Sequence, residues 1–342
     1  MATYPATTTT IEEVEKLSSI SIDLPNALIA YAEQAVLSSK SKSILDGLTN
    51  KASALTKRAS AGTIPTMKKV RIVDAPSVDG QESYARPNGD LYYSRKWSEM
   101  PDVEVLRKGR ANGHYALLYG APGCGKTALV EASFGDELYT ILGSGDTELS
   151  DFIGGYVQTP SGDFEWVDGA LIKSAEQGKV LLIDEIGLID PKVLSALYGL
   201  MDGRKEITIT QNPERGTVKA KDGFYVVGAT NPNAPGVRLS EALLSRCLLQ
   251  VEMTTDWTLA KKLGVPMLAI TASQNLAKKQ LSGEVSWSPQ FRELLAFREI
   301  ESVYGTDWAI SNLIACSPEM DRPVVADVFT RVFGKDCRPA KI

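Results

Sequence analysis

The chain has 342 residues, of which 43% are hydrophobic and 23% are charged, and its formal net charge is −5. This is an ordinary globular composition, long enough for two or three packed units. No apolar run reaches the roughly 18 residues that a membrane-spanning helix needs, and the first residues lack the basic-then-apolar layout of a signal peptide. We therefore expect a cytoplasmic protein with no membrane partner. The acidic balance gives no support to nucleic-acid binding over the whole surface, but it does not exclude a local basic patch.

Residues 1–62 are predicted to form an N-terminal helical region, because apolar residues recur there at spacings of three and four. Residues 63–87 are rich in Pro, Gly and polar residues, which predicts a linker. Within it only residues 69–73, KVRIV, have the composition of a strand. The linker also carries a basic group, for which a solvated connector is a simpler interpretation than a nucleic-acid contact: Lys68, Lys69 and Arg71.

Residues 88–255 alternate short apolar runs with helix-like segments. The runs YALLYG, ELYTILG, VLLIDEIG and FYVVGATN have the composition of strands that are buried on both faces. Their alternation with helices predicts a parallel sheet in an α/β domain. The strand pattern ceases after about Asp256, and we expect residues 256–342 to form a second, small helical domain.

The stretch 120–127, GAPGCGKT, fits the pattern G-x-x-x-x-G-K-[ST] of a phosphate-binding loop between a strand and a helix. Its glycines let backbone N–H groups point at phosphate oxygens beside a helix amino terminus. Lys126 would face the β and γ phosphates, and Thr127 would offer its hydroxyl to Mg²⁺. The alternative, a glycine-rich turn with an exposed lysine, is disfavoured by the flanking elements. We expect the whole loop to bind the nucleotide: Gly120, Ala121, Pro122, Gly123, Cys124, Gly125, Lys126 and Thr127.

A second signal is the apolar run 180–183, which leads into Asp184 and Glu185. Carboxylates at the end of a buried strand need a cation or a polarised water, because unpaired buried charge is costly. Asp184 would bind Mg²⁺, and Glu185 would be the base that activates water for attack on the γ-phosphate. Alone, such a pair is more often a helix cap or a solvated strand end. Its position after a phosphate loop reverses that preference.

Two further side chains follow along the chain. Asn231 ends the run FYVVGATN and would orient the attacking water, because an amide can both donate and accept. Arg246, in LSEALLSRC, would neutralise transition-state charge on the γ-phosphate. Alone, Asn231 is typical of an Asn-Pro turn and Arg246 of a protein surface, so both interpretations depend on the motifs that precede them.

The order GAPGCGKT, LLIDEIG, GATNP and LSEALLSRC, followed by helices, resembles the AAA+ ATPases, and in detail their MoxR-like and dynein-related branch. Two predicted hairpins add to the likeness: YVQT with FEWV before the acidic strand, and EITIT with TVKAK before the asparagine strand. The resemblance extends over about residues 88–334 and does not include the N-terminal helices. It implies a P-loop α/β nucleotide-binding domain followed by a helical lid domain.

The resemblance also implies Mg²⁺-dependent ATP hydrolysis by a ring, in this family usually a hexamer. Arg246 resembles the arginine finger that reaches the nucleotide of a neighbouring subunit. A second sensor is expected near the start of a lid helix, where we favour Arg292 over Gln290. By the same resemblance, Lys126 and Thr127 match the Walker A residues, and Asp184 and Glu185 match the Walker B pair. Asn231 matches the first sensor.

Three functions stay open from the sequence. The leading one is an ATP-driven, chaperone-like remodeller of a protein partner, and the family suggests a von Willebrand factor A domain protein as one such partner. The second is a DNA-directed motor of the helicase, helicase-loader or restriction type. The basic linker and three cations of the second hairpin support it. The third is a nucleotide-binding scaffold that does not hydrolyse, which the presence of a base argues against. The hairpin cations are Arg215, Lys219 and Lys221.

The paired hairpins would lie near the pore of such a ring and contact the client. Their turns, TPSGD and QNPERG, are expected to carry few packing contacts. Replacing Phe164 or Arg215 should therefore leave folding intact and change the coupling to a client.

Overall fold

The computed structural model describes residues 74–78 and 81–340, which belong to one compact unit, Ile72–Ile342. The predicted N-terminal helical region and the three basic residues of the predicted linker lie outside the described residues. Within the described part of the chain, no helix is both long enough and apolar enough to cross a membrane.

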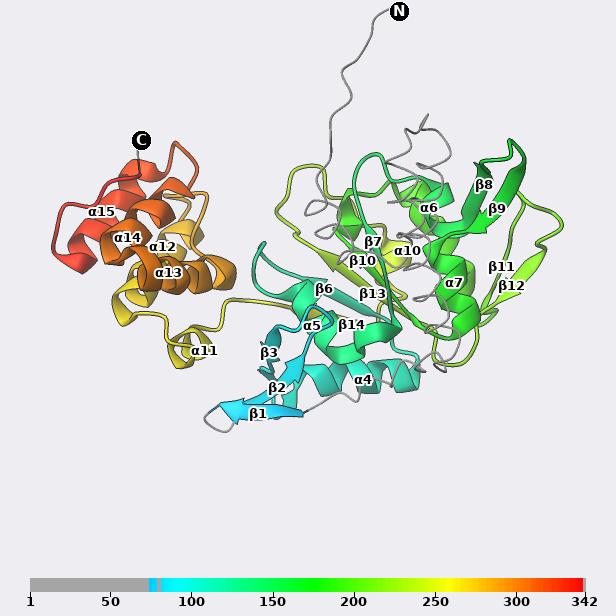
Figure 1. Ribbon diagram of the computed structural model, residues 1–342, viewed down its shortest axis with the longest axis horizontal. Coiled ribbons are helices and arrows are strands. Elements are labelled where there is room, and N and C mark those ends of the chain that lie inside the picture. Colours follow the sequence, from blue (N-terminus) through cyan, green and yellow to red (C-terminus); the bar gives the residue numbers. More distant parts are fainter. Residues whose placement is uncertain (1–73, 79–80, 341–342) are drawn as a thin grey trace, which may run out of the picture. The chain divides into compact units, whose positions relative to one another are not determined.

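A five-stranded parallel sheet forms the centre of the α/β domain (Figure 1). The runs that the sequence predicts as strands supply four of the five, and in β10 the residues from Val180 to Ile183 are fully buried. This architecture confirms the predicted fold class. In spatial order the strands are β14 (Leu249–Glu252), β6 (Ala116–Tyr119), β13 (Tyr225–Thr230), β10 (Val180–Asp184) and β7 (Leu138–Leu142).

Three longer helices accompany this sheet. Helix α5 (Lys126–Phe134) packs against β10 and β13, α7 (Ala170–Gln177) packs against β7 and β10, and α4 (Asp102–Asn112) packs against α5. The remaining helical segments of the domain are short: η1 (Gly135–Glu137), α6 (Leu149–Ile153), η2 (Ile186–Leu188), α8 (Pro191–Leu194), η3 (Ser195–Leu197), α9 (Tyr198–Met201) and α10 (Glu241–Leu244).

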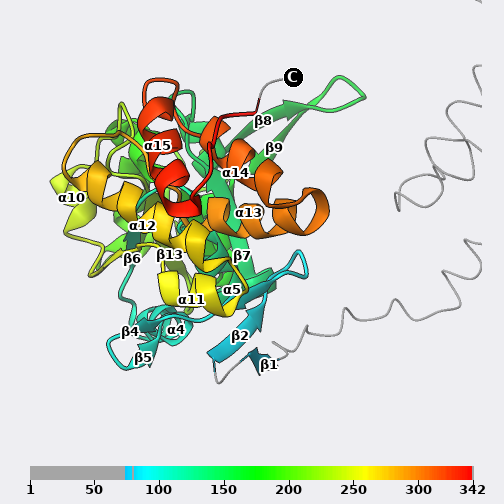
Figure 2. The ribbon, with the colours of Figure 1, turned by 90° about the vertical axis from the view of Figure 1, so that its left-hand side faces the viewer.

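Both predicted hairpins are confirmed. Strand β8 (Gly154–Gln158) pairs with β9 (Phe164–Asp168), and β11 (Glu206–Thr208) pairs with β12 (Thr217–Lys219), each antiparallel. The first hairpin projects away from the rest of its domain (Figure 2), and its Phe164 is 69% exposed, as expected for a turn. The expectation that Arg215 makes few packing contacts is wrong, because its side chain is only 27% exposed and is ion-paired to Asp168.

The prediction of a linker over residues 63–87 is also partly wrong. Strands β1 (Asp74–Val78), β2 (Gln81–Ala85) and β3 (Leu91–Tyr93) form a three-stranded antiparallel sheet. Tyr84 of β2 is buried, and the Arg107 guanidinium lies over its ring at 5.1 Å. Burial of this ring stabilises β2, whose polar residues give no clear strand pattern in the sequence. A further pair of two-residue strands follows: β4 (Lys96–Trp97) and β5 (Met100–Pro101).

The helical lid has its own hydrophobic core, separate from that of the α/β domain. It begins with α11, which Asp256 caps by accepting a hydrogen bond from the Leu259 N–H at 2.9 Å. Helix α14 lies within the range predicted to be helical, and its Ile310 and Leu313 are buried in the lid core. The five helices are α11 (Trp257–Lys262), α12 (Met267–Leu281), α13 (Phe291–Tyr304), α14 (Thr306–Ala315) and α15 (Arg322–Phe333).

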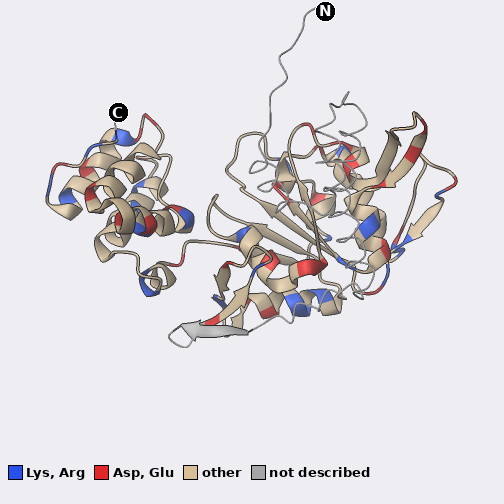
Figure 3. Cartoon of the chain, viewed as in Figure 1, with Lys and Arg blue, Asp and Glu red and all other residues tan. Residues whose placement is uncertain are grey.

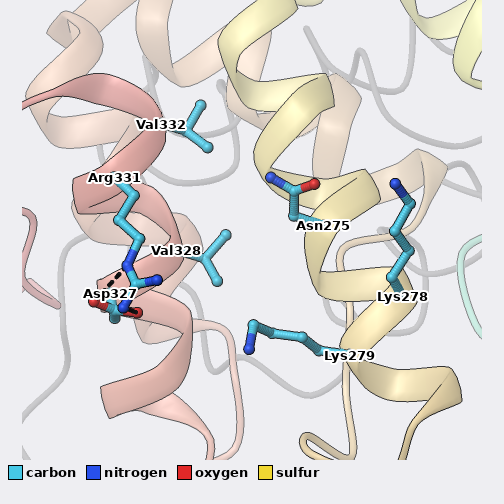
Figure 4. Close-up of a pocket in the computed structure, with 7 residues that line it drawn as sticks. All are labelled: Asn275, Lys278, Lys279, Asp327, Val328, Arg331 and Val332. Atoms are coloured by element: carbon cyan, nitrogen blue, oxygen red, sulfur yellow. Dashed lines mark hydrogen bonds and ion pairs between the residues drawn. The ribbon is translucent and has the colours of Figure 1, made fainter.

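A groove of about 260 Å³ lies between α12 and α15 of the lid (Figure 4). Val328 and Val332 line it beside Lys278, while Arg331 is ion-paired to Asp327 at 2.9 Å. Lys279, at the same groove, pairs with Glu284. Because two of its three cations are neutralised by neighbouring carboxylates, the groove presents little net charge.

Candidate nucleotide-binding site

The phosphate-binding loop connects β6 to α5 with an unusual backbone. Gly120, Gly123 and Gly125 all have positive φ, at 152°, 81° and 95°. A Cβ atom on Gly120 would lie 2.2 Å from the Met253 carbonyl oxygen, so only glycine fits there. Helix α5 begins at Lys126 with no side-chain cap, which leaves its first N–H groups available to an anion.

Lys126 is nearly buried, with an exposed fraction of 6%. Its ammonium group donates to the Gly120 carbonyl at 2.8 Å and to the Ala121 carbonyl at 3.1 Å. The lysine therefore stabilises the curl of its own loop. An ammonium has three donors, and a phosphate oxygen would compete with these neutral carbonyls because a charge-assisted hydrogen bond is stronger.

Thr127 and Asp184 meet although 57 residues separate them in the chain: the Thr127 hydroxyl donates to Asp184 Oδ2 at 2.8 Å. The first residue lies at the start of α5 and the second at the end of β10, and the packing of α5 on β10 brings them together. A hydroxyl and one carboxylate suit Mg²⁺, which usually completes its octahedron with waters and substrate phosphate oxygens. The pair predicted to bind the metal thus has the right chemistry and lies beside the phosphate loop.

Glu185 follows Asp184 with the backbone turned out of the strand. Its φ and ψ are 50° and 40°, a left-handed conformation that is uncommon for a residue other than glycine. The turn is supported by Asp184, whose Oδ1 accepts from the Glu185 N–H at 3.1 Å. Over the described residues, the Glu185 carboxylate has no hydrogen-bond or ion-pair partner, which leaves it available to a water molecule.

Asn231 directly follows β13, the strand that lies between β6 and β10. Its Oδ1 accepts from the Asn233 N–H at 3.2 Å, which fixes the amide and leaves its NH₂ group to donate elsewhere. The preceding Thr230 is buried, and its hydroxyl oxygen has no hydrogen-bond partner. The carboxyl ends of neighbouring parallel strands meet at one sheet edge, so Asn231 lies at the same edge as the loop and Asp184.

Arg246 is not brought to the phosphate loop. It follows α10, where its Nη1 donates to the Ala242 carbonyl at 2.7 Å and its guanidinium lies 4.5 Å from the centre of the Tyr198 ring. Among the described residues, its buried Nε has no hydrogen-bond partner, and its side chain makes no hydrogen bond or ion pair with the loop or with the two strand-end carboxylates.

The lid reaches the loop at the start of α13. The Arg292 N–H donates to the Gly123 carbonyl at 3.1 Å, and a Cβ on Gly123 would lie 3.0 Å from the Arg292 Cβ. The Arg292 side chain is exposed and has no hydrogen bond or ion pair to the described residues. Gln290 instead caps α13 in a reciprocal arrangement with Glu293. Of the two sensor candidates, Gln290 is therefore a helix cap, and Arg292 is an exposed cation beside the loop.

Arg95 is a residue of this region that the sequence reasoning missed. One guanidinium nitrogen donates to the Thr254 carbonyl at 3.0 Å, and another would lie 3.4 Å from a Cβ on Gly125. Its Nε lies 3.6 Å from the buried carboxylate of Asp102, which also accepts from the Tyr92 hydroxyl. Burial is the main cause of the raised pKa of Tyr92. Arg95 belongs to no motif, so nothing in its local sequence marks it.

The loop between β6 and α5, the hydroxyl–carboxylate pair and the strand order define a P-loop nucleotide-binding domain. Residues 116–247 match the family described as AAA domain (dynein-related subfamily). This match confirms the resemblance that the motifs predicted for this part of the chain.

Two curated relatives illustrate the extent of the match. Midasin from Giardia intestinalis is 40% identical over 123 residues, which are 35% of this chain and 2% of midasin. The uncharacterized protein YojN from Bacillus subtilis is 36% identical over 147 residues, 41% of this chain and 47% of YojN. The chain spans less than half of either relative. A solved structure from Cytophaga hutchinsonii aligns with 66% of this chain and 78% of its own at 19% identity, but its TM-score of 0.37 is too low to carry an argument.

Proposed function

We propose that the chain binds and hydrolyses Mg-ATP and, as a ring, remodels a protein partner. The observation that carries the proposal is the Thr127–Asp184 hydrogen bond. It brings a hydroxyl of the phosphate loop and a carboxylate of the acidic strand together, and these two groups would hold Mg²⁺ beside a bound nucleotide.

The proposed roles follow from the positions of the groups. Lys126 and the N–H groups of the loop bind the phosphates, and Thr127 with Asp184 would hold Mg²⁺, which neutralises developing charge on the phosphate oxygens. Glu185 accepts the proton of the attacking water, because its carboxylate is unpaired and at the sheet edge. Asn231 orients that water through its amide.

The lack of contact between Arg246 and the phosphate loop of its own chain supports assembly into a ring. The reaction develops negative charge on the γ-phosphate, and an arginine finger that stabilises it contributes roughly 10³–10⁵ in rate. Arg246 is held by Ala242 and Tyr198 and, among the described residues, has no hydrogen bond with its own loop. We propose that it completes the nucleotide site of a neighbouring subunit. The expected ring is a hexamer.

A protein client is supported by the first hairpin. Among the described residues no element covers its exposed apolar side chains, which is typical of a surface that binds a protein. They are Tyr156 at 56%, Val157 at 54%, Phe164 at 69% and Val167 at 43% exposure.

The charges of the second hairpin weaken the DNA-directed alternative. Arg215 is paired with Asp168 and Glu176, and Lys219 lies 3.6 Å from Glu206. Figure 3 shows acidic and basic residues interspersed around α7 and the two hairpins. A cation that is already neutralised contributes little to counterion release from nucleic acid.

The test is phosphate release from ATP by two variants, alone and mixed. Lys126→Ala and Arg246→Ala should each be inactive, and mixing them should restore activity because some sites then combine an intact loop with an intact finger. Full activity of Arg246→Ala alone would contradict the shared site. Absence of hydrolysis by the wild-type chain at every protein concentration would contradict the proposal as a whole. Stimulation by duplex DNA that falls steeply with salt, without stimulation by any protein, would favour the alternative.

A further inference from the structure

The turn of the second hairpin is joined to the base of the first. Arg215, between β11 and β12, donates from Nε to Asp168 Oδ1 at 3.2 Å and from Nη2 to Asp168 Oδ2 at 3.0 Å. Its Nη2 also lies 2.6 Å from Glu176 Oε1 on α7. A two-pronged guanidinium–carboxylate contact fixes both distance and orientation, which a single lysine contact does not.

The electrostatics agree with this geometry. Burial alone would raise the pKa of Asp168, but hydrogen bonds from Arg215 and Trp166 outweigh it and lower that pKa below its ordinary value of 3.8. Hydrogen bonds to Asp168 and Glu176 in turn raise the pKa of Arg215. Both partners therefore stay charged throughout the neutral range.

Asp168 also connects Arg215 to the aromatic side chains of the first hairpin, of which Trp166 is half-buried against the domain core and Tyr156 and Phe164 are exposed. Its Oδ1 accepts from the Trp166 indole N–H at 2.8 Å, and the Trp166 ring packs edge-on against Tyr156 with centroids 5.2 Å apart. In the strand register Tyr156 lies opposite Trp166, and Gln158 lies opposite Phe164. Residues opposite each other share a face, so three aromatic side chains stand on the face that Asp168 braces.

The hairpin base is the place where its direction is set. A Cβ on Gly154 would lie 2.3 Å from the Val167 carbonyl oxygen, and one on Gly169 would lie 2.4 Å from the Phe152 carbonyl oxygen. These close backbone contacts fix the two strands to each other and to α6. An isolated two-stranded hairpin is marginally stable in water, and beyond its base this one is largely exposed.

We propose that Arg215 is a positioning residue that, through Asp168, sets the orientation of the Trp166–Tyr156–Phe164 face on the neighbouring hairpin. The inference rests on the proposed function only where it takes that face to be the client surface. Only residues 220–224 separate β12 from β13, the strand that ends at Asn231. The same arginine therefore connects the client surface to an element of the nucleotide site.

The test uses ¹⁹F NMR of the full chain labelled with 5-fluorotryptophan, which gives one signal for each of its five tryptophans. Trp166→Phe assigns the Trp166 signal. Arg215→Gln and Asp168→Asn should each shift that signal while the other four stay in place. The double variant should show no larger shift than either single variant, because both changes break one connection. Arg215→Lys should give an intermediate shift, since it restores the charge but not the two-pronged contact.

The matched control is Lys219→Gln, which removes an exposed cation from the same hairpin. It should leave the Trp166 signal in place. A Trp166 signal unchanged in Arg215→Gln, or shifts that add fully in the double variant, would overturn the proposal. If Arg215→Gln does not fold, Arg215→Lys and Asp168→Asn decide the question by the same comparison. A wild-type chain without ATP hydrolysis would refute the proposed function but leave the fluorine result standing, so the two failures are distinguishable.

Discussion

The left-handed backbone at Glu185 allows its chemical role to be separated from its structural cost. A residue other than glycine in this region costs on the order of 1–3 kcal/mol, and Glu185 is such a residue, with φ 50° and ψ 40°. Glu185→Gly removes the Cβ that causes the cost but adds about 0.5–1 kcal/mol of unfolded-state entropy. Glu185→Ala also lacks the carboxylate but keeps the Cβ, so it is the matched control. We expect the glycine variant to be more stable than the alanine variant by about 0.5–2 kcal/mol.

Thermal unfolding measures this difference, and phosphate release measures the chemistry. A difference of 1 kcal/mol corresponds to a shift of about 2–4 °C in Tm for a domain of this size. Both variants, and Glu185→Gln, should bind ATP and lose turnover by roughly 10²–10⁴-fold, the usual contribution of a general base. A glycine variant less stable than the alanine variant would refute the argument from strain. Turnover near the wild-type rate in Glu185→Gln would remove Glu185 from the role of base.

Two further predictions concern charges outside the proposed catalytic groups. Arg95→Ala should lower the free energy of unfolding by about 1–3 kcal/mol, because it leaves the buried Asp102 carboxylate less well paired; urea unfolding measures this, and an unchanged midpoint would contradict it. The stabilisation that the wild-type chain gains over Asp168→Asn should be complete above pH 3.8, the ordinary pKa. Because the pKa of Asp168 is lowered in the folded state, this stabilisation should be lost as the pH falls through that lower value. If the difference in the free energy of unfolding between the two proteins does not depend on pH, the ionised carboxylate is not the stabilising group.

The sequence predicted those features in which one local pattern determines the structure. The run Val180–Ile183 contains only large apolar residues, and it forms a strand buried on both faces. Because parallel strands end at one edge, motif order alone was enough to place Asp184 beside Thr127. Neither inference needed any knowledge of a side-chain contact.

The sequence could not predict features that depend on contacts between distant residues. Tyr84 lies in a strand in which Arg107 and the surrounding core cover its ring. Arg215 occupies a turn whose composition favours exposure, yet its partner Asp168 lies 47 residues earlier in the chain. Propensity and periodicity contain no information on such pairs, so a turn that is packed and a turn that is free have the same pattern.

Arg246 illustrates how far a structural observation narrows a role that a motif leaves open. Its guanidinium is held by Ala242 and by the Tyr198 ring, and the Tyr198 hydroxyl is hydrogen-bonded to Ser240, the residue that caps α10. A solvated surface arginine would have neither the ring contact nor a buried donor. The Nε group is nevertheless buried without an acceptor, which costs about 1–3 kcal/mol if nothing compensates it. An arginine that is held in this way, and has no contact with its own phosphate loop, supports the proposal that it acts on the nucleotide of another subunit.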